Sequence, residues 1–152
     1  MSGPAYIALN ELPAAVWRTP VLIRFGHCDP AGIVYTPEYF NIFNGVIEDW
    51  YAASLKLPYH DFIRNRRTGL GYVHVSADFA CPSTIGDVIE VAVVVEAVGR
   101  TSLTLKVHAF SNQSLCVCAT FVTVTTSLET HRPVPIPDDL RTALERYRSG
   151  VA

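Results

Sequence analysis

The stretch PEYFNIFNGVIEDWYAASL, residues Pro37–Leu55, decides how the rest of this 152-residue chain can fold. Its apolar side chains recur every three or four positions, which is the period of an α-helix. They are Tyr39, Phe40, Phe43, Val46, Ile47, Trp50 and Tyr51. Polar side chains are few, and Asn41, Asn44 and Glu48 fall on one narrow stripe. A helix that is apolar around most of its circumference is expected to be buried.

The segments that follow this helix read mostly as β-strands. Short turns separate four predicted strands at residues 70–82, 88–98, 103–111 and 116–127, and a first strand is predicted at 19–25. A short helix within 57–69, closed by Gly69, and a last helix from Pro137 past Tyr147 are also expected. Consecutive strands joined by short turns form an antiparallel sheet. We therefore expect one α+β domain over residues 1–152, with an antiparallel sheet of about five strands wrapped around a long central helix.

Composition narrows the possible functions. Hydrophobic residues make up 49% of the chain and charged residues 17%, which is lean in charge for a monomer, so a homodimer or homotetramer is expected. The net charge of −2 argues against binding of nucleic acid. No stretch approaches the ~20 apolar residues of a membrane span, and residues 1–17 lack the basic start and apolar core of a signal peptide. The cytoplasm is the expected location.

The four cysteines show no spacing typical of a metal site or of a disulfide framework. Cys116 and Cys118 are two positions apart in a predicted strand, so we expect them to point to one face as reduced core thiols.

A turn with a single carboxylate precedes the helix, in the sequence HCDPAGIVYTPEYF at residues 27–40. Thr36 as the N-cap followed by Pro37 at the first helical position is typical of a helix start. The free backbone N–H groups there could stabilise the oxyanion of an acyl-transfer reaction. Asp29 lies seven residues before Thr36. If the loop folds back, its carboxylate could act as a nucleophile or as a general base on a reactive acyl group such as a thioester. The alternative is that Asp29 only shapes the turn, because Asp-Pro favours turns.

The segment CDPAGIVYTPEYF, residues 28–40, resembles the motif of the 4-hydroxybenzoyl-CoA thioesterase group of the hot-dog superfamily. The resemblance continues at lower specificity to about residue 127. It implies a hot-dog fold and hydrolysis of an acyl- or aroyl-CoA thioester, with coenzyme A entering as part of the substrate and no other cofactor or metal. It further implies that Asp29 is the catalytic carboxylate and that the backbone N–H of Thr36 is the oxyanion donor, with the site near a subunit interface.

The same resemblance implies substrate-binding residues beyond this motif. Arg100, Thr101 and Ser102 match a hairpin that binds the nucleotide phosphates of CoA, although the hairpin is less basic here than in the family. Tyr35, His27 and His74 are further candidate substrate-binding residues, proposed from their positions. His27 lies two positions before Asp29 and either orients it or faces solvent, and His74 shares one face of its predicted strand with Asp78. The family often has an acid at position 27 and an aromatic residue or a histidine at position 36, so the acyl pocket is expected to differ.

Other readings of these residues stay open. Arg64, Arg66 and Arg67 could contact the CoA phosphates or could simply favour a helix end. Glu48 is expected to have a secondary role. The rival functions are a hot-dog acyl dehydratase, which would need a His base and an acid across the helix, and a domain that binds acyl-CoA for sensing without hydrolysing it.

Overall fold

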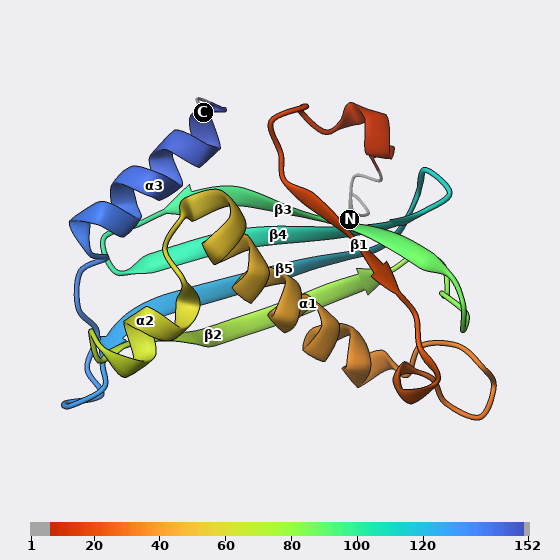
Figure 1. Cartoon of the computed structure of the whole chain (residues 1–152), viewed down its shortest axis with the longest axis horizontal. Helices are drawn as coiled ribbons and strands as arrows, with labels where there is room; N and C mark the ends of the chain where they lie inside the picture. Colours follow the sequence, from red (N-terminus) through yellow and green to blue (C-terminus); the bar gives the residue numbers. More distant parts are fainter. Residues whose placement is uncertain (1–6, 151–152) are drawn as a thin grey trace, which may run out of the picture.

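The computed structural model describes residues 7–150, which form five strands and three α-helices (Figure 1). The strands are β1 (Arg18–Leu22), β2 (Thr68–Phe79), β3 (Val88–Val98), β4 (Ser102–Ser111) and β5 (Ser114–Ser127). The α-helices are α1 (Thr36–Trp50), α2 (Tyr59–Arg64) and α3 (Asp138–Ser149), with short helical turns η1 (Leu9–Glu11), η2 (Phe25–His27) and η3 (Tyr51–Leu55). The strands pair antiparallel in the order β1-β3-β4-β5-β2.

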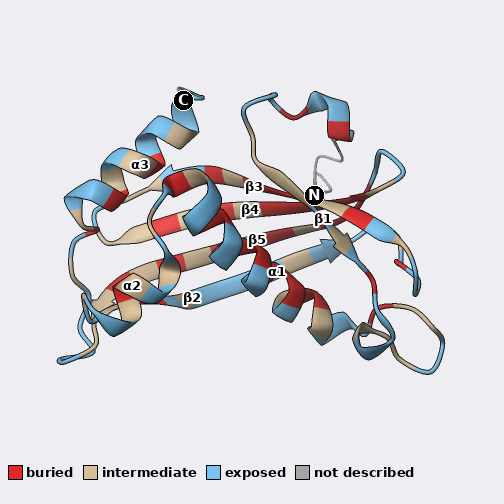
Figure 2. Ribbon diagram, viewed as in Figure 1, coloured by how far each residue is buried: buried red, intermediate tan, exposed pale blue. Residues whose placement is uncertain are grey.

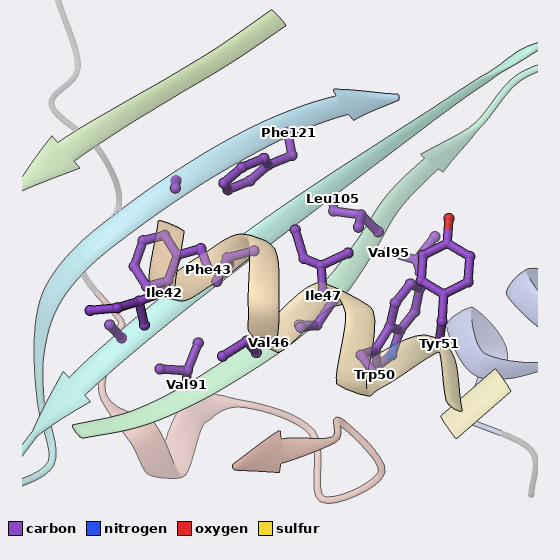
Figure 3. Packing of buried hydrophobic residues seen from close by; sticks show 14 of the residues in the cluster. Ile42, Phe43, Val46, Ile47, Trp50, Tyr51, Val91, Val95, Leu105 and Phe121 are labelled. Atoms are coloured by element: carbon purple, nitrogen blue, oxygen red, sulfur yellow. The ribbon is translucent and has the colours of Figure 1, made fainter. Parts of the chain in front are cut away.

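Helix α1 lies across one face of this sheet, and the sheet curves around it (Figure 1). This is the hot-dog fold, as predicted. The inward side of α1 carries buried apolar side chains, among them Phe43 and Trp50, which are fully buried. They pack against strand residues such as Leu105 and Phe121 (Figure 3). Burial of these apolar side chains removes them from water, and this hydrophobic burial stabilises the fold.

The prediction that the helix is buried around most of its circumference is wrong. Asn41, Asn44, Gly45, Glu48 and Asp49 are all exposed, so α1 has one buried face and one open face (Figure 2). A single five-stranded sheet reaches only one side of the helix, and Glu48 lies on the uncovered side together with Asn41 and Asn44.

The predicted helix also changes geometry before its end. Regular α-helix stops at Trp50, and residues Tyr51–Leu55 form a π-helical turn that closes at Lys56 in the left-handed conformation, with φ of 58°. Trp50 and Tyr51 are neighbours in sequence, yet both are fully buried, and their rings meet edge to face at a centroid distance of 5.3 Å. The aromatic anchor at this end of the helix therefore uses two consecutive residues.

Helix α2 ends at Arg64, so Gly69 does not close it as predicted. Gly69 instead lies inside β2, opposite Thr126 of β5. A Cβ atom at position 69 would come within 2.4 Å of the Thr126 Oγ1 atom, so the glycine allows the two strands to approach.

The outer face of the sheet, away from α1, is partly covered by the chain before β1. Leu9 and Leu12 pack there against Phe110 and Leu115. Cys118 packs with this outer cluster, whereas Cys116 belongs to the inner core around α1. The prediction that the two cysteines share a face is therefore wrong. A break in the β4–β5 register between Ala109 and Phe110 inserts an extra residue and shifts the alternation of side chains.

Helix α3 packs over β3 and η3 (Figure 1). It begins at Asp138, one residue later than predicted, with Pro137 at the N-cap position. The Tyr147 hydroxyl accepts a hydrogen bond from the Trp17 N–H at 2.9 Å, which joins the last helix to the chain before β1. No helix within residues 7–150 is long and apolar enough to cross a membrane. We predicted that residues 1–17 contain no signal peptide. Residues 1–6 of this segment lie outside the described residues.

Candidate active site

The loop between η2 and α1 folds back on itself, as the sequence predicted. Cys28 and Val34 form an antiparallel bridge, and the Tyr35 N–H donates to the His27 carbonyl at 2.9 Å. These pairings bring the segment that carries Asp29 beside the segment that leads into α1. The loop is held from outside by residues 83–85, because the Val34 N–H donates to the Ser83 carbonyl at 2.9 Å.

Asp29 begins the tight turn of this loop. Its Oδ1 atom accepts the Ala31 N–H at 2.9 Å, and its carbonyl accepts the Gly32 N–H at 2.9 Å. Gly32 has φ of 78°, a left-handed conformation that a glycine adopts at low cost. The carboxylate is half-buried, and its second oxygen has no hydrogen-bond partner among residues 7–150. Asp29 therefore shapes the turn with one oxygen and keeps the other available.

The start of α1 differs from the prediction by one residue. Tyr35, rather than Thr36, is the N-cap, and its side chain makes no capping hydrogen bond. Thr36 is already the first helical residue, and the structure gives its N–H no acceptor in the described part of the chain. An uncapped helix start with a free N–H is a favourable place for an anion. Tyr35 itself is 56% exposed.

His27 is positioned by its own turn, because its Nδ1 atom accepts the Arg24 N–H at 3.0 Å. Because Nδ1 is engaged with the Arg24 backbone, it does not hydrogen-bond to the Asp29 carboxylate, and the structure gives no support for His27 orienting Asp29 through this atom.

An open apolar pocket of about 530 Å³ lies between the exposed stripe of α1 and strand β2. Its lining residues are Phe40, Asn41, Asn44, Tyr72, Val75 and Phe121. Tyr72 donates its hydroxyl to Asn44 Oδ1 at 2.9 Å, and burial raises the pKa of Tyr72, so its hydroxyl stays protonated. The sequence analysis did not identify Phe40 and Tyr72 as site residues. The polar stripe of Asn41 and Asn44 marks the α1 side of this pocket, whereas the position of Tyr72 depends on how the sheet folds.

A family model described as the thioesterase-like superfamily matches residues 23–144. The chain belongs to this superfamily.

Named relatives agree with this assignment. The chain is 27% identical over 125 residues to a 1,4-dihydroxy-2-naphthoyl-CoA hydrolase of Synechococcus elongatus, covering 82% of this chain and 91% of the relative. It is 28% identical over 81 residues to a 4-hydroxybenzoyl-CoA thioesterase of Pseudomonas sp. strain CBS-3, covering 53% of this chain and 57% of the relative. The resemblance inferred from the Asp29 motif is thus confirmed.

Solved structures support the same fold. A 1,4-dihydroxy-2-naphthoyl-CoA thioesterase from Synechocystis superposes with a TM-score of 0.78 at 21% identity, covering 85% of this chain and 95% of the other.

Within one chain of this thioesterase-like protein, the hairpin Arg100–Ser102 lies far from the Asp29 loop. The loop contacts residues 83–85, just before β3 starts at Val88, whereas the hairpin follows the end of β3 at Val98. A strand of this length separates the two by roughly 30 Å. Figure 1 shows them at opposite ends of the sheet.

The hairpin backbone is firmly held. Arg141 donates to the Gly99 carbonyl at 2.7 Å, and the Ile136 N–H donates to the Arg100 carbonyl at 2.9 Å. The Thr101 carbonyl accepts a hydrogen bond from the Thr125 N–H at 2.9 Å. The Arg100 side chain is exposed. The superfamily member therefore presents Arg100 to solvent on a fixed backbone.

The other predicted contacts lie elsewhere. His74 pairs with Val122, on the face of the sheet away from α1, because the next residue, Val75, pairs with the inward-facing Phe121. Arg66 makes a two-pronged ion pair with Asp139 at 2.8 and 3.0 Å, and this hydrogen bonding lowers the pKa of Asp139. Arg67 binds Glu129 at 3.0 Å. Two of the three arginines considered for CoA phosphates are thus engaged with carboxylates, while Arg64 is exposed.

Proposed function

We propose that the protein hydrolyses an acyl-CoA thioester with an aromatic acyl group, giving the free acid and CoA. The observation that carries this proposal is the half-buried Asp29 carboxylate in a loop folded against the uncapped start of α1. The superfamily assignment supports the same substrate class, and so do the names of the relatives, which refer to 1,4-dihydroxy-2-naphthoyl-CoA and 4-hydroxybenzoyl-CoA.

The chemistry requires one group to deliver oxygen to the thioester carbon and another to stabilise the carbonyl oxygen. Asp29 supplies the first, either by attacking the carbon directly or by taking a proton from an attacking water. The Thr36 N–H supplies the second, because a backbone donor at a helix start stabilises the oxyanion of the tetrahedral intermediate. The thiolate of CoA then leaves. We expect no metal and no separate cofactor in these steps.

The apolar pocket beside α1 is the proposed site for the acyl group. Its aromatic walls meet edge to face, with ring centroids 6.4 Å apart for Phe40 and Phe121 and 5.0 Å apart for Tyr72 and Phe121. Such an arrangement offers ring faces and edges to an aromatic guest. Asn41 and Asn44 provide the polar groups at its rim.

A second copy of the chain would complete the CoA site. Strand β2 ends the sheet, and its outer edge has no partner strand in the described chain. A two-fold axis through the middle of β2 would pair two copies antiparallel and reverse the partner's sheet. The partner's Arg100 hairpin would then lie at the same end as this chain's Asp29 loop. We therefore propose a homodimer, alone or within a homotetramer, in which Arg100, Thr101 and Ser102 bind CoA phosphates across the interface.

A charge on the β2 edge tests this arrangement. Val73 is 67% exposed on β2, and we expect Val73→Lys to lower the mass in solution to that of one chain, because like charges would face each other at the new edge. Native mass spectrometry or light scattering measures the result. The matched control is Val88→Lys, which is 57% exposed on β3 and should leave the mass unchanged. A Val73→Lys protein that stays oligomeric contradicts the pairing.

Thiol release tests the activity. The native protein is incubated with benzoyl-, hydroxybenzoyl-, naphthoyl- and short-chain acyl-CoA, and the free CoA thiol is followed by absorbance. We expect the aroyl esters to be hydrolysed faster than the short-chain esters. Binding of the esters without release of thiol from any of them would contradict the proposal and favour the sensing function. A cytoplasmic location remains a prediction from the sequence.

A further inference from the structure

Two cysteine thiols are in contact close to the start of α1. The sulfur atoms of Cys81, which follows β2, and of the buried Cys116 in β5 are 2.8 Å apart. The side chains of the other two cysteines lie elsewhere, with Cys28 bonded to the Arg24 carbonyl and Cys118 on the outer face of the sheet. Cys81 and Cys116 are therefore the two cysteines whose sulfur atoms are in contact.

The backbone holds this pair in place. The Ala80 N–H donates to the Cys116 carbonyl at 2.7 Å, and the Cys81 N–H donates to the same carbonyl at 3.3 Å. The register break in β4–β5 turns Cys116 toward the inner core, where it faces Cys81 rather than Cys118. Because both backbones are fixed by hydrogen bonds, a covalent S–S bond of about 2.05 Å needs only a small approach of the two side chains.

The two thiols differ in access and acidity. Cys116 is fully buried, and burial, together with its hydrogen bond to Cys81, raises the pKa of Cys116 to about 12. Cys116 is therefore a neutral thiol at physiological pH. Cys81 is partly exposed and lines a small pocket of about 220 Å³ that also contains Thr36 and Tyr39. A small oxidant entering from solvent reaches Cys81 first.

We propose that Cys81 and Cys116 form a reversible disulfide when the protein meets a peroxide. The Cys81 sulfur attacks one peroxide oxygen, the O–O bond breaks, and Cys81 becomes a sulfenic acid while water leaves. The Cys116 sulfur then attacks the Cys81 sulfur, the S–O bond breaks, and the proton of Cys116 leaves with the hydroxyl as a second water. Two thiols are oxidised and one peroxide is reduced to two waters. A dithiol reductant reverses the change.

This site is placed to act on the loop that carries Asp29. Ser83 lies two residues after Cys81 and accepts the Val34 N–H, and Thr84 forms a bridge with Ile33. The disulfide would fasten the start of this supporting segment to β5. The proposal stands independently of the proposed hydrolysis, since it concerns thiols whose state can be counted directly.

The test uses the full-length native protein and a small excess of hydrogen peroxide. Free thiols are counted after unfolding, and the oxidised protein is digested without reduction for mass spectrometry. We expect two of the four thiols to disappear, one peptide pair joined through Cys81 and Cys116, and recovery of four thiols after dithiothreitol. Measurement at several protein concentrations distinguishes this disulfide, which forms within one chain, from disulfides between chains.

Two variants serve as matched controls. The double variant Cys28→Ser with Cys118→Ser keeps the proposed pair and should lose both remaining thiols, whereas Cys81→Ser at the partly exposed position should lose no pair of thiols within one chain. The proposal is overturned if the native protein keeps all four thiols under conditions that oxidise a free cysteine peptide, or if Cys81 is found joined to Cys28, Cys118 or another chain.

Discussion

Replacing Asp29 with Asn should lower the turnover of an aroyl-CoA by about two orders of magnitude or more, because the amide can neither attack the thioester nor take a proton from water. The amide oxygen can still accept the Ala31 N–H, so the turn should persist. The measurement compares kcat for thiol release by the native and Asp29→Asn proteins, with circular dichroism to show that both are folded.

The matched control for this prediction is Asp49→Asn. Asp49 is an exposed carboxylate on the open face of α1, so its loss removes the same charge without touching the loop. We expect its turnover to stay within about twofold of the native value. Equal turnover by Asp29→Asn and the native protein would reduce Asp29 to a turn residue.

Replacing Phe43 with Ala should lower the free energy of unfolding by about 3–5 kcal/mol. Phe43 is fully buried in the helix–sheet interface, on the side of α1 that faces Phe121 (Figure 3). Its ring centroid lies 5.9 Å from that of Tyr39 and 6.4 Å from that of Phe121. Alanine would leave a cavity that these rigid rings cannot fill. Urea denaturation at a fixed protein concentration measures the loss, since association adds to apparent stability.

Phe25 provides the matched control for that change. It is the same residue type at 84% exposure, just before the Asp29 loop, so Phe25→Ala should change the free energy of unfolding by no more than about 0.5 kcal/mol. If Phe43→Ala proves as mild as Phe25→Ala, α1 does not form the core that the structure describes.

The sequence predicted the fold because each element has a strong local signal. The three- and four-residue spacing of Phe43, Val46 and Trp50 defined the helix, and runs of β-branched residues between short turns defined the strands. The errors arose where tertiary contacts override such signals. The open face of α1 depends on how far the sheet reaches, and the divergent faces of Cys116 and Cys118 depend on an extra residue in one strand pair.

The candidate site was predictable in part for the same reason. Asp29 and the start of α1 are close in sequence, so turn and cap preferences indicated the folded loop. The distance between Asp29 and Arg100 could not be read in this way, because it depends on which end of β3 each segment meets. Likewise, Phe40 and Tyr72 line one pocket although they lie 32 positions apart, and only the placement of α1 beside β2 in the folded chain brings them together.

The hydrogen bonds that Ile136 and Arg141 make to the Arg100 hairpin can form only late in the synthesis of the chain on the ribosome. Ile136 and Arg141, which hold the hairpin carbonyls, are synthesised about 40 residues after the hairpin itself. The central helix and all five strands are complete before these residues emerge. A chain cut short before residue 136 would therefore contain every strand of the sheet and still lack the hydrogen bonds that Ile136 and Arg141 make to the carbonyls of this hairpin.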